Sequence, residues 1–402
     1  MFFVNEPHNE FQPPWKQTFE ERFRKLCSRR RRVAYFYEAA DTSTFRYRAY
    51  NMCCALMEGT SDVSAAYFFN SDAGHFDAIV DAADVLVICR MRYTDKLAGL
   101  IARAQGLGKR VLFDVDDLVF NVDYVQLILQ TLAQDLKHPG VWDHWFAYIS
   151  RIGAVAKLCD GSITTNKYLA ARLEEFTGKK AAIVQNFMNQ EQLAISERIF
   201  AEKVDSSFRR TEEVYIGYFS GTPTHNHDFS MVGSALRQLM REDPRIRLLV
   251  VGFLDLSNEL AEVADRITTY PLHDFINLQR IMSLVEINIV PLLDNTFTNC
   301  KSELKYFESA AVGTVTVATP IYSYRSAIQN GETGFLANST SWYDVLRRAI
   351  AVVDGDYARI ADAARTQAIA QYAWFNQVAV IERALFAGVE SRPGHLRECF
   401  AG

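Results

Sequence analysis

Short apolar runs alternate with helical segments along most of the chain, and this alternation constrains the fold more than any other feature. The runs with strand character in the first half lie at residues 33–37, 63–69, 83–89, 110–115, 159–166 and 180–186. Strands separated by helical segments pair in parallel through right-handed crossovers. The sequence therefore predicts an α/β fold with parallel sheets.

The same pattern starts again after residues 190–213, which are polar and charged and indicate a connection between domains. The strand runs of the second half lie at residues 214–220, 246–252, 287–291, 313–319 and 334–338, and residues 342–389 are almost wholly helical by period. A chain of 402 residues is long enough to bury two such cores. We expect two doubly wound Rossmann-like sheets, with ligands bound at the carboxyl ends of their strands.

Composition excludes several classes of protein. The net charge of −5 gives no general attraction to nucleic acid. The 7 cysteines form no CxxC pair and no ligand-spaced cluster, which indicates free thiols in a reducing compartment and predicts no zinc site. The chain has no apolar run of 18 residues, and its first residues lack the basic and apolar regions of a signal peptide. We therefore expect a cytoplasmic protein.

A run of four arginines, Arg29 to Arg32, directly precedes the first strand. One interpretation is a solvated helix and linker. The other is attraction to anionic lipid headgroups, which would hold the protein at the inner face of a membrane. The sequence leaves both interpretations open.

Residues 302–312 have helical spacing, and the first turn of this helix carries Ser302 as a candidate cap and Glu303 as an early acidic residue. A helix N-terminus favours a phosphate or diphosphate, and Lys301 adds a full positive charge beside it. Glu308 follows about a turn and a half later, where a carboxylate can accept two hydrogen bonds from a ribose diol. The combination predicts a nucleotide site. The alternative is that Glu308 and Lys301 are ordinary exposed helix residues.

The stretch KSELKYFESAAVGTVTVATPIYSYRSAIQNGETGFLAN (301–338) resembles the nucleotide-sugar-binding segment of retaining glycosyltransferases of the GT-B fold, the family 4-like group of bacterial surface-polysaccharide type. Glu308, Gly313, the strand at 314–318 and NGETGFL at 330–336 match that segment in order and spacing. Weaker similarity extends over roughly residues 33–390. The resemblance implies two Rossmann-like domains facing a cleft and a C-terminal helix that crosses back to the first domain.

The domain boundaries that we expect combine this resemblance with the strand pattern. They are an N-terminal basic extension at 1–32, an acceptor-binding domain at 33–190, a connection at 191–213, a nucleotide-sugar-binding domain at 214–375 and a C-terminal helix at 376–402.

The family's donor residues carry over unevenly. Glu308 matches the ribose-binding glutamate, and the backbone of 301–304 matches the diphosphate loop. The family usually has an earlier glutamate that contacts the donor sugar, and Cys300 stands at that position. Asn299, Glu303 or backbone groups of 298–302 are the candidate substitutes.

Family members also carry an arginine and a lysine after the first strand of the second domain, to neutralise the leaving diphosphate. The corresponding residues 217–229 contain neither type. His225 and His227 are candidates for that role, because a diphosphate favours the imidazolium form. Backbone and hydroxyl donors of Gly221 and Thr222 would assist. Lys301 and Lys305 would then supply the remaining positive charge, with Lys305 and His227 acting on the leaving group.

The acceptor side is expected in the first domain. The strand 110–115 ends in a run that contains Asp114, Asp116 and Asp117. Asp116 is the candidate that orients, or accepts a proton from, the acceptor hydroxyl, and the alternative for it is a structural role in a loop or helix cap. Asp114 and Asp116 also mimic a metal-binding DxD, which we discount because the nucleotide signature lies in the other domain.

Further acceptor candidates follow other strands of the first domain. Arg46 and Arg48 are suited to an anionic acceptor or to phosphates, because a guanidinium binds them bidentately. Thr165 and Asn166 are candidates for contacts with sugar hydroxyls. The alternative for each of these residues is turn chemistry.

Together these features predict a retaining, metal-independent hexosyltransferase or deoxyhexosyltransferase without a cofactor. It would move a sugar from a nucleotide-diphosphate donor to a glycan or lipid-linked acceptor, as in lipopolysaccharide O-antigen or capsule synthesis. Two alternatives remain: a degenerate GT-B domain that binds or assembles without catalysis, and a metal-dependent enzyme that uses Asp114 and Asp116.

Overall fold

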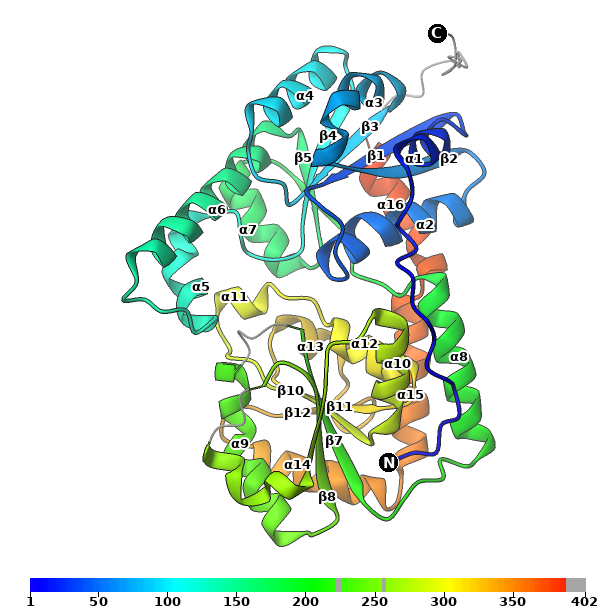
Figure 1. Ribbon diagram of the computed structural model, residues 1–402, viewed down its shortest axis with the longest axis vertical. Helices are drawn as coiled ribbons and strands as arrows, with labels where there is room; N and C mark the ends of the chain where they lie inside the picture. The colour runs from blue at the N-terminus through cyan, green and yellow to red at the C-terminus, as the bar shows by residue number, and fades with distance from the viewer. Residues whose placement is uncertain (222–225, 255–257, 388–402) are drawn as a thin grey trace. The chain divides into compact units, whose positions relative to one another are not determined.

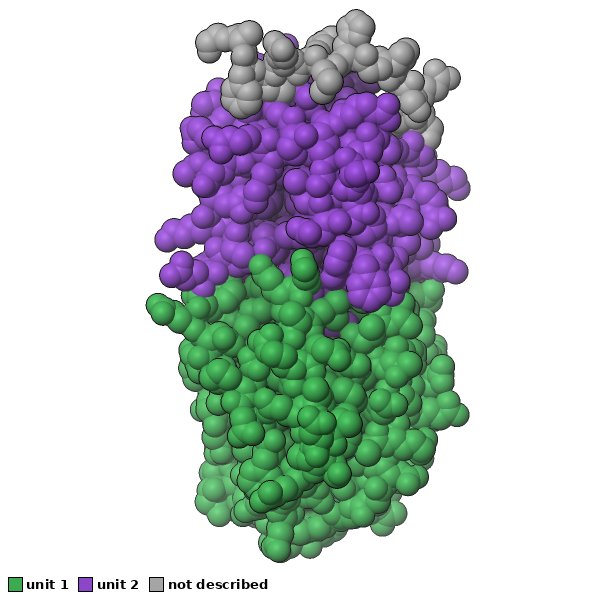
Figure 2. Space-filling view, turned by 90° about the vertical axis from the view of Figure 1, so that its right-hand side faces the viewer, with its two compact units in different colours: residues 1–11, 126–137, 190–373 green, residues 12–125, 138–189, 374–402 purple. Residues whose placement is uncertain are grey.

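The computed structural model describes residues 1–221, 226–254 and 258–387 (Figure 1). Contacts divide the chain into two compact units, which Figure 2 shows in different colours. Unit 1 consists of Met1–Phe11, Gln126–Lys137 and Gln190–Ala373. Unit 2 consists of Gln12–Val125, His138–Asn189 and the chain from Trp374 on. Each unit therefore combines segments that are distant in the sequence.

Unit 2 is built on a six-stranded parallel sheet of order β2-β1-β3-β4-β5-β6. Its strands are β1 (Arg31–Tyr37), β2 (Val63–Phe69), β3 (Val85–Cys89), β4 (Arg110–Val115), β5 (Gly161–Thr164) and β6 (Ala181–Ile183). All five residues of the central β3 are buried, as expected for a strand covered by helices on both faces. The parallel sheet that the alternating pattern predicted is confirmed.

Helices cover this sheet and connect its strands. They are α1 (Phe19–Leu26), α2 (Asn51–Gly59), α3 (Phe76–Ala82), α4 (Asp95–Gly106), α6 (Pro139–Leu158), α7 (Lys167–Thr177) and α16 (Trp374–Phe386). The last of these, α16, packs on α2 in a contact that requires a glycine: a Cβ atom on Gly59 would lie 2.3 Å from Val378 Cγ2. The chain thus returns to unit 2 at its C-terminal helix, as the fold class predicted.

Unit 1 has a second six-stranded parallel sheet, of order β12-β11-β10-β7-β8-β9. Its strands are β7 (Val214–Ser220), β8 (Ile246–Gly252), β9 (Ile267–Tyr270), β10 (Ile287–Val290), β11 (Val315–Ala318) and β12 (Phe335–Leu336). The apolar runs predicted all of these except β9. That edge strand has the sequence ITTY with its two threonines exposed, so it leaves no apolar run in the sequence.

The helices of unit 1 are α5 (Val125–Thr131, which begins in unit 2), α8 (Gln190–Asp205), α9 (Asn226–Glu242), α10 (Phe275–Leu284), α11 (Thr296–Asn299), α12 (Leu304–Ala311), α13 (Tyr322–Ala327), α14 (Trp342–Val353) and α15 (Tyr357–Tyr372). The polar segment expected to be a connection is thus largely the helix α8. Its buried Ile195 and Ile199, four residues apart, pack into the core of unit 1 with Leu249 and Val285.

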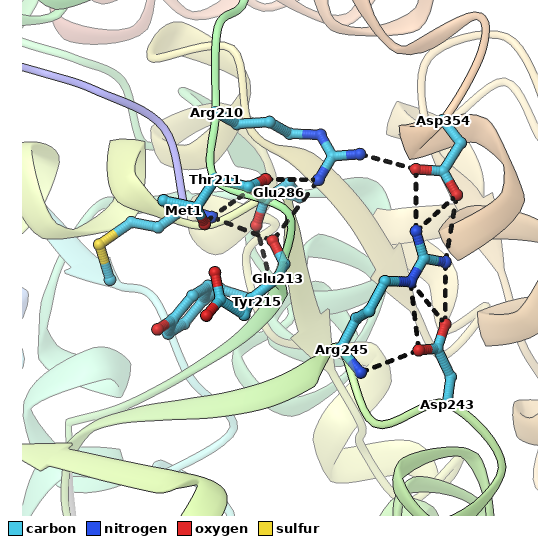
Figure 3. A network of polar contacts seen from close by, with 9 residues as sticks. All are labelled: Met1, Arg210, Thr211, Glu213, Tyr215, Asp243, Arg245, Glu286 and Asp354. Atoms are coloured by element: carbon cyan, nitrogen blue, oxygen red, sulfur yellow. Dashed lines mark hydrogen bonds and ion pairs between the residues drawn. The ribbon is translucent and has the colours of Figure 1, made fainter.

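The N-terminal residues 1–32, expected as one extension, divide between the units. Phe2 lies in the core of unit 1 and its backbone N–H donates to Leu284 O at 2.9 Å. Figure 3 shows the ammonium group of Met1 beside Glu286 Oε1, at 2.7 Å. Burial raises the pKa of the Glu286 carboxyl and lowers the pKa of the Met1 ammonium group. The first residues are therefore an integral part of unit 1.

The four arginines before β1 are not a free basic patch. The guanidinium of Arg29 donates to four backbone carbonyls, among them Met57 O at 2.7 Å and Thr60 O at 2.6 Å at the end of α2. Arg30 pairs with Asp62 at 3.0 Å. The remaining two begin β1: Arg31 stacks on Phe386 at 3.6 Å from the ring centroid, and Arg32 is buried. The run has a structural role, so the geometry does not favour the lipid-headgroup interpretation. Among the described residues, no helix has the length and apolarity needed to cross a bilayer.

Candidate functional site

The predicted donor segment lies at the carboxyl ends of two neighbouring strands of unit 1. Strands β10 and β7 are paired in parallel, and the segments that follow them lead to α12 and α9. Asp228, in the first turn of α9, accepts a hydrogen bond from Leu293 N at 3.0 Å and so ties the two segments together. Parallel sheets bind ligands at this edge.

Glu308 lies on α12 and is 2 % exposed, so it is not an ordinary solvated helix residue. Its Oε1 accepts a hydrogen bond from Gln192 Nε2 of α8 at 3.2 Å. Gln192 was not predicted, because α8 was expected to be a connection. A glutamate held in place from a second helix is oriented before any ligand arrives.

Lys305 brings positive charge to the same place. Partial burial lowers the pKa of its ammonium group to about 8, and Lys301 lowers the pKa further, whereas Asp228 and Glu308 raise it. These effects show that the four side chains are close enough to interact electrostatically. Asp228 is a second residue that the sequence reasoning missed. The only sequence signal for Asp228 was its position after a predicted strand, and the two nearby histidines were selected instead.

Gly313 ends this segment in a conformation that other residues rarely adopt. Its φ is +67°, and a Cβ atom there would lie 2.9 Å from Phe200 Cδ2. Its carbonyl oxygen accepts hydrogen bonds from Tyr357 Oη at 3.0 Å and Lys203 Nζ at 3.2 Å. The glycine of the family motif is therefore explained by backbone geometry and not by ligand contact.

Several predicted donor residues are occupied by the fold itself. Asn299 Nδ2 donates to Asp294 Oδ1 and to Asn295 O, both at 2.7 Å, and its Oδ1 accepts from Tyr322 N at 2.6 Å. Cys300, at the position of the family's earlier glutamate, is fully buried. In this structure neither side chain is available for a donor sugar.

Glu303 takes the N-cap position of α12, but its side chain makes no capping hydrogen bond. It is 4 % exposed and lies near Tyr324 and Tyr372, where burial and then the charge of Glu303 raise the pKa of each phenol. Ser302 is partly exposed next to Lys301. The side chains of Asn299 and Glu303 are thus engaged or buried, which leaves the backbone groups of 298–302 as the predicted substitute.

The predicted histidine loop is described only in part. Thr222 and His225 lie outside the described residues. Gly221 is exposed, and His227 is an exposed residue in the first turn of α9, one residue before Asp228. Its backbone oxygen accepts a hydrogen bond from Ser230 Oγ at 2.7 Å.

In unit 2, Arg48 and Asp114 form a buried ion pair. Arg48 Nε lies 2.7 Å from Asp114 Oδ1 and Nη2 lies 2.9 Å from Oδ2, and the two side chains are 0 % and 1 % exposed. Arg48 Nη1 also donates to Val184 O at 2.7 Å. Both residues were predicted to bind the acceptor. Their polar groups are used within the fold and are almost fully buried, so the geometry favours a structural role for both residues.

Arg46, Thr165 and Asn166 also have local roles. The guanidinium of Arg46 stacks 3.9 Å from the ring centroid of Tyr47, and its Nε donates to Thr42 O at 3.0 Å. Thr165 is 1 % exposed. Asn166 is the N-cap of α7 and accepts from Leu169 N at 2.9 Å. For these residues the geometry supports the alternative of turn and cap chemistry.

Asp116 lies in a polar cluster at the carboxyl ends of β3 and β4. Its carboxylate accepts from Thr44 Oγ1 at 3.1 Å and from Arg90 Nη1 at 3.3 Å. Arg90 also lies 3.6 Å from Asp117 and donates to Tyr148 Oη at 3.3 Å. Burial raises the pKa of Asp116, while Arg90 opposes the shift. A partly exposed carboxyl with a raised pKa is suited to exchanging a proton with a hydroxyl.

Arg90 was not predicted, although it directly follows the strand run at 83–89. Its φ is +48°, which is uncommon for a residue with a side chain, and its N–H donates to Asp114 O at 2.9 Å. Such conformations persist where the surroundings hold them and gather at functional sites. The position after a central strand was the signal that could have identified it.

Comparison with known families supports the class of protein. Residues 213–353 match the family model described as "Glycosyl transferases group 1", and this range contains β7 through α14 with the whole donor segment. No curated protein sequence matches the chain.

Solved structures share the fold over most of the chain. HepE from Anabaena, in complex with UDP and glucose, has 10% identity and a TM-score of 0.59, with 88% of this chain and 99% of that chain covered. A glycosyltransferase from Rickettsia africae has 14% identity, a TM-score of 0.58 and coverage of 88% and 98%. Sucrose-phosphate synthase from Thermosynechococcus elongatus has 16% identity, a TM-score of 0.57 and coverage of 88% and 99%. The fold is GT-B, and the protein is a glycosyltransferase.

Proposed function

We propose that the protein transfers a sugar from a nucleotide-diphosphate donor, bound by unit 1, to a hydroxyl of a glycan or lipid-linked acceptor. The observation that carries this proposal is the cluster of Glu308, Lys305, Lys301 and Asp228 at the strand ends of the family-matched region. It combines a fixed carboxylate for a ribose diol with two ammonium groups for a diphosphate. HepE was solved with UDP and glucose, which supports a donor of this chemistry.

The proposed chemistry rests on positioning and on charge. Lys301, Lys305 and His227 would stabilise the negative charge that develops on the departing diphosphate. Asp116, held by Thr44 and Arg90, would orient the acceptor hydroxyl in unit 2 or take its proton. The family resemblance implies retention of configuration without a covalent enzyme intermediate.

We expect no metal requirement. Asp114 is engaged by Arg48, and Asp116 by Arg90 and Thr44, so the two carboxylates of the DxD-like pair already have guanidinium partners. A divalent ion would have to displace them. This geometry does not favour the alternative of a metal-dependent enzyme.

The pathway is also part of the proposal. The resemblance favours synthesis of a surface polysaccharide, such as a lipopolysaccharide O-antigen or a capsule chain, by a family 4-like hexosyltransferase or deoxyhexosyltransferase. The free thiols of the described cysteines favour a reducing, cytoplasmic location. Peripheral contact with the inner face of a membrane would then need a surface other than Arg29 to Arg32.

A binding screen tests the donor site. UDP, GDP, TDP and ADP are titrated by calorimetry into wild type and Glu308→Ala, with and without EDTA. We expect one nucleotide to bind wild type with micromolar affinity, and EDTA should not change this affinity. The same nucleotide should bind at least tenfold more weakly to Glu308→Ala. Equal binding to both proteins would reject the assigned site, and dependence on a divalent ion would reject metal independence.

A degenerate GT-B domain that binds or assembles remains the second candidate. It is favoured by the burial of Cys300 where the family has a sugar-binding glutamate, and by the engagement of Asn299 in the fold. A well-folded wild type that binds no nucleotide would favour this candidate.

A further inference from the structure

A pocket of about 680 Å³ lies in unit 1 between α9 and α14. Figure 1 shows the two helices as neighbours, and Tyr343 Oη of α14 donates to Glu242 Oε2 of α9 at 2.6 Å. The pocket contains none of the residues predicted for the donor site. Its volume is in the range of about 300–1,000 Å³ that is typical of ligand sites.

The wall from α9 combines Met231, Ser234 and Ala235 with a stripe of larger polar side chains. Arg237, Gln238, Arg241 and Glu242 recur at the spacing of one helix face. The wall from α14 adds the rings of Trp342 and Tyr343. Planar polar groups beside aromatic rings offer both hydrogen bonds and flat apolar contacts.

The charges of this pocket balance. Arg237 Nε and Arg241 Nη1 each lie 3.8 Å from the same oxygen, Glu262 Oε1. Hydrogen bonds from Tyr343 and Gln238 lower the pKa of Glu242, which therefore stays ionised. The charged side chains that line the pocket are thus Arg237, Arg241 and Glu242, and Glu262 beside the pocket offsets the remaining positive charge. A balanced site has no net attraction for phosphate, anionic lipid or nucleic acid.

Donors remain unused in the pocket. Within the part of the chain that the structure describes, the two guanidinium groups make only these long ion pairs, and the buried indole N–H of Trp342 has no hydrogen-bond partner. Gln238 Nε2 is held by Glu242 Oε1 at 2.9 Å, which fixes the orientation of both groups. The unused donors and the fixed acceptor match a neutral ligand that is rich in hydroxyl groups.

We propose that this pocket binds a neutral oligosaccharide. Its role would be that of a second binding site for the acceptor glycan, and this role rests on the proposed function. By keeping the growing chain attached to unit 1, the pocket would raise the effective concentration of the acceptor.

The probes are maltohexaose, cellohexaose, isomaltohexaose and chitohexaose, with a heparin hexasaccharide as the anionic comparison, each titrated by calorimetry into the full chain. We expect at least one neutral probe to bind to wild type and to bind at least tenfold more weakly to Arg237→Ala/Arg241→Ala. Arg241 is exposed and Arg237 is partly exposed on α9, so the variant should fold. The matched control is Arg348→Ala, which removes an exposed arginine of α14 that does not line the pocket.

Three outcomes would overturn the inference: no neutral probe binds, the double variant binds as wild type does, or only the heparin hexasaccharide binds. UDP binding, measured in parallel on Glu308→Ala, separates this inference from the proposed function. Glycan binding by a wild type that binds no nucleotide would uphold the pocket and reject the donor site. Glycan binding that Glu308→Ala retains while it loses the nucleotide would uphold both.

Discussion

Lys305 is the residue whose chemistry links structure to binding most directly. Burial lowers the pKa of its ammonium group from the usual 10.5 to about 8. Below that pH the folded and unfolded chains both carry the proton, so the cost of the buried charge is present in full. Between about pH 8 and 10.5 the folded chain loses the proton first, so the free energy of unfolding increases as the pH rises.

The same titration predicts a pH dependence of diphosphate binding. Above about pH 8, neutral Lys305 no longer attracts the diphosphate, whose own ionisation is complete by then. We expect affinity to fall by up to about tenfold per pH unit from pH 8 to 9.5, with uptake of a proton on binding. Calorimetry in buffers of different ionisation enthalpy measures both quantities.

Lys305→Arg is the control, because a guanidinium keeps its charge over this range. Its affinity should stay level from pH 8 to 9.5. A fall as steep as that of wild type would show that another group titrates, and would remove Lys305 from the diphosphate site.

The buried pair of Arg48 and Asp114 gives a prediction about stability. Asp114→Ala leaves the fully buried Arg48 without its counter-charge, so we expect a loss of about 3–5 kcal/mol in the free energy of unfolding. Arg48→Met/Asp114→Leu should recover much of this loss, because both charges are gone. Urea unfolding at pH 7 measures both variants.

The matched comparison is the exposed pair of Arg30 and Asp62, for which Arg30→Ala should destabilise the protein far less than Asp114→Ala does. If Asp114→Ala unfolds as wild type does and only an acceptor-dependent activity is lost, then Asp114 binds the acceptor after all.

At the scale of elements, substitution of Asn166 distinguishes a helix-capping role of this residue from a role in acceptor binding. As N-cap of α7 it accepts from Leu169 N, so Asn166→Ala should cost about 1 kcal/mol of stability. Asn166→Asp keeps the accepting oxygen and should stay within a few tenths of wild type. Thermal unfolding followed by circular dichroism compares them. Full stability of Asn166→Ala would contradict the capping role.

The sequence predicted the elements wherever burial left a local pattern. Strands β2, β4, β7 and β8 begin and end at the residues that their apolar runs indicated. Strand β9 and helix α8 were missed, for the same physical reason. Each element buries only part of its surface. Most of its residues are therefore polar, and the sequence shows no clear apolar periodicity there.

Part of the candidate site could be predicted from the sequence. The local order of Glu308, Gly313 and the following strand indicated the donor segment, and its role in donor binding stays a prediction. The partners of single side chains were not predictable, because they come from distant segments: Arg48 meets Asp114, Glu308 meets Gln192, and Asp116 meets Arg90. Spacing along a chain carries no information on such contacts.

At the scale of the whole molecule, each unit contributes one chemically distinct set of groups. Unit 1 carries the carboxylate and ammonium groups around Glu308, and unit 2 carries Asp116 with Arg90. The proposed function assigns the donor to unit 1 and the acceptor to unit 2, so we expect neither unit to act alone.

The most direct test measures the release of nucleoside diphosphate from nucleotide sugars. The sugars carry the base that the binding screen identifies, and a bacterial extract of glycans and lipid-linked saccharides serves as the acceptor. The account predicts release by wild type that EDTA leaves unchanged and that Glu308→Ala reduces at least a hundredfold, with a product that keeps the anomeric configuration of the donor by NMR. A wild type that binds the nucleotide sugar but leaves it intact with every acceptor would contradict the account and indicate a binding scaffold.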